Sequence, residues 1–216
     1  MSGEIVQQLF AKRIGGSNFG KDDTVYKFEK IKRAKRAAVQ DHPGVELIDL
    51  GVGEPDGMTP SPVVEKLTQE AAVYENRGYT DNGIDEFREA VAWHMEHVYG
   101  VSGLDPATQI NHSIGSKSAL ALLPSALVDQ GDLVLMTVPG YPVFGTHSAW
   151  YGAEVQNLPL TEDNDFLPDL DSLDEQTACR AKVLVINYPN NPTGKAATPE
   201  FFRKVVDWAH KYKVAI

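Results

Sequence analysis

The sequence predicts an α/β fold with a mainly parallel sheet covered by helices. From residue 110 onward, strand-like and helix-like segments alternate along the chain. This alternation is typical of a parallel sheet with helices packed on its faces. The segment Val183–Ile186 is continuously apolar, as expected of a strand that is covered on both faces.

Four strands and three helices are expected in this alternating region. The expected strands are residues 109–114, 133–138, 154–158 and 182–187. The expected helices are residues 116–128, 142–151 and 199–212. Lys213–Ile216 resembles the start of a further core strand after a complete helix, and we therefore interpret the chain as truncated.

The first hundred residues predict mostly helices and loops. The expected elements are helices at 25–40, 61–74 and 84–98 and a short strand at 47–50. Apolar residues recur at helical spacing in the third helix, and Gly100 is expected to end it. Residues 1–23 contain several glycines and are expected to form a loose arm.

The composition excludes several classes of protein. The net charge of −10 argues against a general role on nucleic acid or an anionic membrane, and the basic run Lys27–Arg36 is interpreted as a solvated helix face. The only cysteine, Cys179, cannot form an internal disulfide, which fits a reducing compartment. No segment has the apolar length of a signal peptide or a membrane span, so we expect a cytoplasmic protein.

Three loops follow expected strands, where α/β sheets bind their ligands. In the first, Gly115 allows a close backbone approach, and Ser116 and Lys117 add side-chain donors at the start of a helix. Such a helix start suits a phosphate dianion, although an ordinary N-cap serine explains the pattern equally well.

The other two loops present a ring and an amide. Tyr141 is held between Gly140 and Pro142, so its ring could stack on a flat ligand, or it could simply pack on the core. In Asn187–Gly194 two prolines restrain the backbone, and the side-chain amide of Asn191 can donate to an oxyanion. The alternative is a loop that only closes the end of the strand.

Other familiar sites are excluded by spacing. The glycines at 51, 53 and 57 do not match a dinucleotide-binding fingerprint, and Gly115-Ser116-Lys117 lacks the order of a Walker A loop. No serine has the G-x-S-x-G setting of an esterase nucleophile. His94 and His97 lack a third nearby ligand, so no metal site is expected.

Taken in order, the motifs resemble the fold type I pyridoxal-phosphate (PLP) aminotransferases of class I/II. Four blocks carry the resemblance, which covers residues 24–216: Gly51–Asp56, Tyr79–Arg88, Pro139–Tyr141 and Asn191–Gly194. Within that family the chain is most similar to the LL-diaminopimelate aminotransferases. The resemblance implies a PLP-binding large domain at 101–216, cofactor and substrate loops with connecting helices at 47–100, and an arm and helix at 1–46, with part of the small domain included.

The resemblance also implies roles for individual residues. Tyr141 would stack on the pyridine ring, Asn191 would donate to the ring oxygen, and Gly115, Ser116 and Lys117 would hold the phosphate. Two further residues are implied in substrate binding, in addition to Asn191: Gly53, through its backbone, and Tyr26. Tyr79 would reach the phosphate of the neighbouring subunit, so that a homodimer shares its sites.

The family's remaining cofactor groups lie later than Ile216. They are an aspartate on the ring nitrogen, the Schiff-base lysine and two arginines. No residue of this chain is therefore assigned a catalytic role, and the chain alone is expected to be inactive. The whole enzyme would move an amino group between an amino acid and a 2-oxo acid such as 2-oxoglutarate. A non-catalytic binding fragment, or another PLP chemistry such as a β-lyase, remains an alternative.

Overall fold

The computed structural model describes residues 3–21, 27–51, 53–80 and 82–216. Two compact units divide the chain between them. One unit is Val25–His112, and the other combines Met1–Thr24 with Ser113–Ile216.

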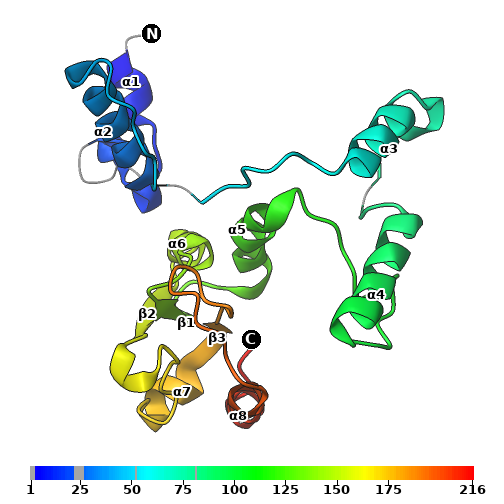
Figure 1. The fold of residues 1–216 in the computed structure, drawn as a ribbon. Coiled ribbons are helices and arrows are strands. Elements are labelled where there is room, and N and C mark those ends of the chain that lie inside the picture. The colour runs from blue at the N-terminus through cyan, green and yellow to red at the C-terminus, as the bar shows by residue number, and fades with distance from the viewer. Residues whose placement is uncertain (1–2, 22–26, 52, 81) are drawn as a thin grey trace. The chain divides into compact units, whose positions relative to one another are not determined.

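The second unit contains a parallel sheet with the strand order β2-β1-β3 (Figure 1). Its strands are β1 (Leu133–Val138), β2 (Glu154–Pro159) and β3 (Ala181–Val185). Its α-helices are α1 (Gly3–Gln8), α5 (Gly115–Leu127), α6 (Val143–Trp150), α7 (Glu175–Arg180) and α8 (Pro199–Tyr212). The expected α/β fold with a parallel sheet is confirmed.

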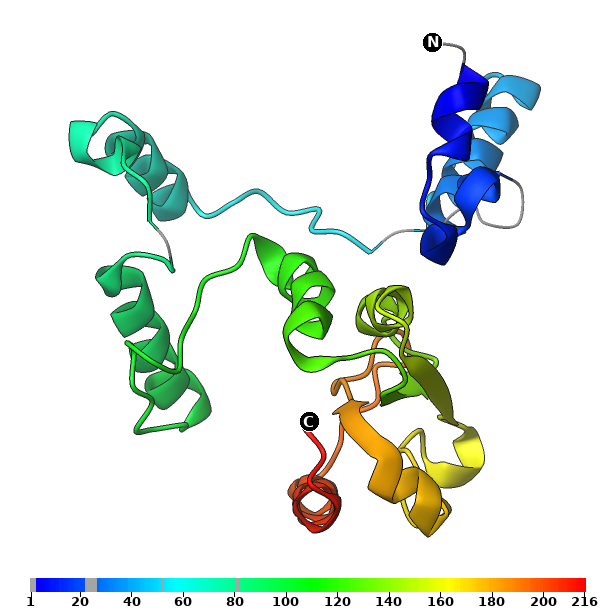
Figure 2. The same ribbon diagram turned by 180° about the vertical axis from the view of Figure 1, so that it is seen from behind.

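Helices cover both faces of the sheet because apolar side chains alternate along β1. Leu133 and Leu135 pack in one buried cluster with residues of α8. Val134 and Met136 point to the opposite face and pack with Phe144 of α6. Figures 1 and 2 show α6 and α8 on opposite sides of the strands. This explains why the central strand β1 is almost wholly apolar instead of alternating with polar residues.

The pairing of β3 differs slightly from the expected strand at 182–187. Leu133 pairs with Ala181 and Val134 with Val183, so Lys182 is an extra residue at a bulge. The Lys182 side chain forms an ion pair with Asp132 at 2.9 Å. The strand begins one residue early and pairing ends at Val185, because the backbone partner, and not the apolar run, determines where a strand stops.

A further segment pairs with the outer side of β3. The amide of Leu184 donates to the carbonyl of Ala215 at 2.8 Å, and the amide of Ala215 donates to the carbonyl of Lys182 at 2.9 Å. The expectation that Lys213–Ile216 begins a strand is therefore confirmed as an isolated parallel bridge.

Two expected strands are wrong. Residues 109–114 and 47–50 have no strand structure. Their sequences suit an extended chain, but a strand also needs a neighbour to accept its backbone hydrogen bonds. In the part of the chain that the structure describes, the sheet has three strands and neither segment joins it.

The N-terminal arm is more ordered than expected. Besides α1 it contains the short 3-10 helices η1 (Lys12–Ile14) and η2 (Gly16–Asn18). The side-chain amide of Gln7 donates to the carbonyls of Ser17 and Phe19 at 3.0 and 2.8 Å. These local bonds fold the arm back on itself, so the expectation of a loose arm for residues 1–23 is wrong over the described part.

The unit Val25–His112 is helical, as expected. Its helices are α2 (Lys27–Asp41), α3 (Ser61–Ala71), the 3-10 helix η4 (Tyr74–Arg77) and α4 (Asp85–Tyr99). Gly100 ends α4 in the left-handed conformation, with φ of 69°, which is the usual reason for a glycine at this position. Helix α3 ends three residues before the expected Tyr74.

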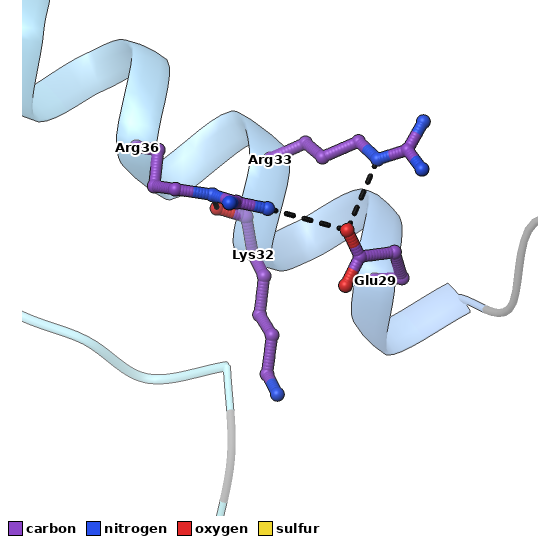
Figure 3. A network of polar contacts seen from close by, with 4 residues as sticks. All are labelled: Glu29, Lys32, Arg33 and Arg36. Carbon is purple, nitrogen blue, oxygen red and sulfur yellow. Dashed lines mark hydrogen bonds and ion pairs between the residues drawn. The ribbon is translucent and has the colours of Figure 1, made fainter.

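The basic run in α2 lies on an exposed helix surface. Arg33 and Arg36 both contact the carboxylate of Glu29, at 3.1 and 3.2 Å (Figure 3). The hydrogen bond from Arg33 is the main cause of the lowered pKa of Glu29. Ion pairs this exposed are screened by water, which agrees with the interpretation of the basic run as a solvated face over residues 29–36.

Candidate functional site

The loop between β1 and α6 presents Tyr141. The chain turns sharply after β1, and a Cβ atom on Gly140 would lie only 2.3 Å from the carbonyl oxygen of Thr137. Only glycine fits such a close backbone approach. Tyr141 follows at once and is partly buried, so its position is determined by the turn before it and by α6 after it.

The loop after β3 presents Asn191. The side-chain oxygen of Asn187 accepts a hydrogen bond from the backbone N–H of Asn191 at 3.1 Å. The backbone of Asn190 makes two further bonds of 2.7 Å each, donating to Lys195 and accepting from Gly194. The loop backbone is therefore well bonded, while the Asn191 side chain is exposed and available to a ligand.

Asn190 joins these two loops. Its side chain is only 3% exposed. The side-chain nitrogen donates to the carbonyl of Pro139 at 3.4 Å, and the side-chain oxygen accepts from the amide and the hydroxyl of Thr193 at 3.2 and 2.8 Å. Because β1 and β3 are adjacent and parallel, their carboxyl ends meet at one edge of the sheet, and Asn190 lies between the segments that leave it.

Sequence reasoning missed Asn190. The sequence predicted its neighbour Asn191 as the donor to a ligand. Two adjacent asparagines do not reveal from sequence which of them is buried. The signal that could have found it is the pairing of β1 with β3. Adjacent parallel strands bring Pro139 close to the second loop, and a buried amide is a suitable group to satisfy both backbones.

Tyr188 holds the other side of the Asn191 loop. Its hydroxyl donates to the carbonyl of Phe166 at 2.9 Å, and its ring lies edge-on to Phe201 at 5.5 Å. Asp165 and Phe166 both have positive φ, 56° and 54°, and Lys195 forms an ion pair with Asp165 at 2.5 Å. The strained turn at 165–166 is thus bound to both ends of the Asn191 loop.

Burial gives Tyr188 a measurable signature. It raises the pKa of the phenol to about 12, above the ordinary value of about 10. Between these pH values the unfolded chain releases the proton and the folded chain retains it. We expect the free energy of unfolding to fall as pH rises from about 10 to about 12, and the fall to be smaller in Tyr188→Phe. Denaturant unfolding at several pH values measures this. The matched control is the exposed Tyr151→Phe, and equal slopes in the two variants would contradict the assignment.

The start of α5 is open. Its N-cap residue is Ile114, and no side-chain hydrogen bond caps the helix within the described chain. Ser116 therefore lies inside the first turn and is not an N-cap serine, so that alternative is wrong. Gly115 has φ of 72° and open space around it, and Ser116 and Lys117 are exposed. The N–H of Gly115 donates to the carbonyl of Ser113 at 2.9 Å, so an anion at this helix start would meet the N–H groups that follow Gly115 and the Ser116 and Lys117 side chains.

The remaining expected residues belong to the other compact unit or fall outside the described residues. Gly53 is in an extended stretch between α2 and α3, and Tyr79 follows η4 with a fully exposed side chain. Both belong to the unit Val25–His112, whereas the three loops belong to the other unit. Tyr26 lies outside the described residues.

The two histidines of α4 are engaged locally. His97 contacts the carbonyl of Trp93 at 2.8 Å and stacks on its ring, while His94 lies edge-on to Tyr99. Among the residues with described positions, no group of three or more histidine, cysteine or acidic side chains could hold a metal ion. No described helix has the length and apolar character needed to cross a membrane.

Comparison with known proteins identifies the class to which this fold and these loops belong. Residues 45–216 match the family model described as aminotransferase class I and II. The chain therefore belongs to the class I and II aminotransferase family, and the resemblance to this family is confirmed.

Two relatives show which enzymes within the family this chain resembles. The chain is 58% identical to the LL-diaminopimelate aminotransferase of Methanocaldococcus jannaschii, over 98% of this chain and 50% of that protein. It is 53% identical to the enzyme of the same name from Methanococcus maripaludis, over 94% and 49%. The chain spans about half the length of these curated relatives.

Solved structures support the fold. The structure superposes on apo-BacF from Bacillus subtilis with a TM-score of 0.81 and 32% identity, covering 89% of this chain and 49% of that one. An aminotransferase from Staphylococcus aureus gives a TM-score of 0.73 and 30% identity, covering 81% and 45%.

Proposed function

We propose that this chain is part of a PLP-dependent aminotransferase. The observation that carries the proposal is the meeting of the Tyr141 and Asn191 loops at the carboxyl edge of the sheet, joined through buried Asn190. Ligands of open α/β sheets bind at this edge. The family match supports the assignment of PLP as the ligand.

The residues of this chain fit the parts of the cofactor. The uncapped first turn of α5, with the Ser116 hydroxyl and the Lys117 ammonium, would hold the phosphate. The partly buried ring of Tyr141 would stack on the pyridine ring, and the exposed amide of Asn191 would donate to the ring oxygen. When bound, PLP supplies an electron-accepting ring for the transfer of an amino group. The residues named here bind and orient it, and none is proposed as catalytic.

The proposed amino donor is LL-2,6-diaminopimelate, with a 2-oxo acid such as 2-oxoglutarate as its partner, in lysine biosynthesis. The names of the relatives support this choice. Gly53 and Tyr26 are proposed to contact the substrate. The exposed Tyr79 is proposed to reach the phosphate in a second subunit of a cytoplasmic homodimer. The proposed organisation remains an arm and helix at 1–46, loops and helices at 47–100 and a PLP-binding domain at 101–216.

The cofactor assignment predicts a loss of affinity on removing the ring. Tyr141→Ala should weaken PLP binding by about two- to twelvefold, since a stacked aromatic pair contributes about 0.5–1.5 kcal/mol beyond its burial. Tyr141→Phe keeps the ring and should bind PLP nearly as well. Asn191→Ala should shift the absorbance maximum of the bound cofactor. The measurement is a PLP titration followed by absorbance, with Tyr151→Ala as the control.

Unchanged affinity and spectra in both Tyr141→Ala and Asn191→Ala would show that these loops do not hold the cofactor. The activity itself is measured on the product of the whole reading frame, as glutamate formed from LL-2,6-diaminopimelate and 2-oxoglutarate. Absence of glutamate with that donor, together with release of pyruvate or ammonia from another amino acid, would favour a lyase.

A further inference from the structure

We propose that Asn190 is a positioning residue that couples the Tyr141 and Asn191 loops, so that the ring and the amide are held in register for one flat ligand. The inference rests on the proposed function for the identity of that ligand. The coupling itself rests on the contacts of Asn190 and can be tested without any ligand.

The hydrogen-bond partners of Asn190 distinguish it from the other buried polar side chains. Among the described residues the buried polar side chains are Thr137, Ser148 and Asn190. Ser148 bonds to a carbonyl of its own helix, at Phe144, and Thr137 bonds across the sheet to Val185 at 3.4 Å. Asn190 instead connects two segments that carry candidate ligand groups.

The two ends of the Asn190 carboxamide have separate tasks. The oxygen accepts from the amide and the hydroxyl of Thr193 and so closes the turn that contains Asn191. The nitrogen donates to the carbonyl of Pro139, two residues before Tyr141. This second bond, at 3.4 Å, is long for an N–H···O contact, and it lies in a part-buried setting.

Only a short side chain with both a donor and an acceptor can perform both tasks. Aspartate keeps an oxygen for Thr193 but places a second oxygen against the Pro139 carbonyl. Alanine removes all three side-chain hydrogen bonds. The two substitutions therefore separate the coupling of the loops from the closure of the Asn191 turn.

Amide hydrogen exchange on the whole 216-residue chain tests the coupling. In Asn190→Asp we expect the amides of Gly140 and Tyr141 to exchange about two- to twelvefold faster, the range for the loss of one hydrogen bond, while those of Thr193–Lys195 stay unchanged. In Asn190→Ala both sets should exchange faster. The control Thr193→Val, which removes only the hydroxyl, should affect Thr193–Lys195 alone. The amides of α8 report whether each variant is folded.

The coupling is overturned if Asn190→Ala leaves Gly140 and Tyr141 at the wild-type rate, and this arm also decides the matter if Asn190→Asp does not fold. PLP titration of the same variants adds the ligand. Faster exchange at both loops with weaker PLP binding supports the whole proposal. Faster exchange at both loops, while the product of the whole reading frame binds no PLP, would retain the coupling and reject the proposed function.

Discussion

Gly140→Ala is expected to lower the free energy of unfolding by about 1–3 kcal/mol, the usual effect of forcing an extra group into a packed site. The added methyl group would meet the backbone carbonyl of Thr137 at 2.3 Å. A backbone atom cannot rotate away as the end of a side chain can, so the turn after β1 must open. Tyr141 should move with it, and PLP affinity should fall together with stability.

Gly53→Ala is the matched control for this prediction. A Cβ atom there would meet nothing within 4 Å, so the free energy of unfolding should hardly change. Denaturant unfolding of both variants, with circular dichroism to confirm the fold, is the measurement. Equal stabilities would mean that the turn at Gly140 is looser than the structure shows.

Leu135→Ala should have an effect of similar or greater size, a loss of about 2–5 kcal/mol. Leu135 is completely buried in the central strand β1, where it packs in the cluster that includes residues of α8. Removing the side chain leaves a cavity that both the sheet and α8 line, and neither can easily fill it.

The same chemical change at an exposed position separates burial from side-chain chemistry. Leu122 in α5 is 67% exposed, and alanine has a higher helix propensity than leucine. Leu122→Ala should therefore be close to neutral in the same denaturant experiment. A loss at position 122 as large as that at 135 would refute the buried core described for β1.

The elements that local pattern predicts well are those whose boundaries are marked in the sequence itself. β1 begins and ends where expected, and α8 spans 199–212 as expected. In α8 the side chain of Thr198 accepts from the Phe201 amide at 3.1 Å, and Pro199 occupies the first turn. Such caps depend only on residues next to the helix start, so the sequence predicts them directly. The short helix α7 was missed, although Asp174 caps it, because six residues carry too little periodicity.

The sequence pattern could not predict which segments pair with one another in the sheet. Residues 109–114 and 47–50 look extended, but a strand is a property of two segments, and the partner cannot be seen in either alone. The same limit hid Asn190. Tyr141 and Asn191 were recognised from their own loops, whereas the role of Asn190 appears only when β1 and β3 are known to be neighbours.

The two outer edges of the sheet have opposite consequences for self-association. The amides of Glu154 and Leu160 donate inward to carbonyls beside β1, so the N–H positions of residues 155, 157 and 159 face the free edge of β2. At 159 that position is a proline, which has no hydrogen to donate. A strand of a second molecule that paired with this edge would lack the hydrogen bond from residue 159. The β3 edge already pairs with Ala215. A further strand can therefore pair at β3, whereas Pro159 disfavours pairing at β2.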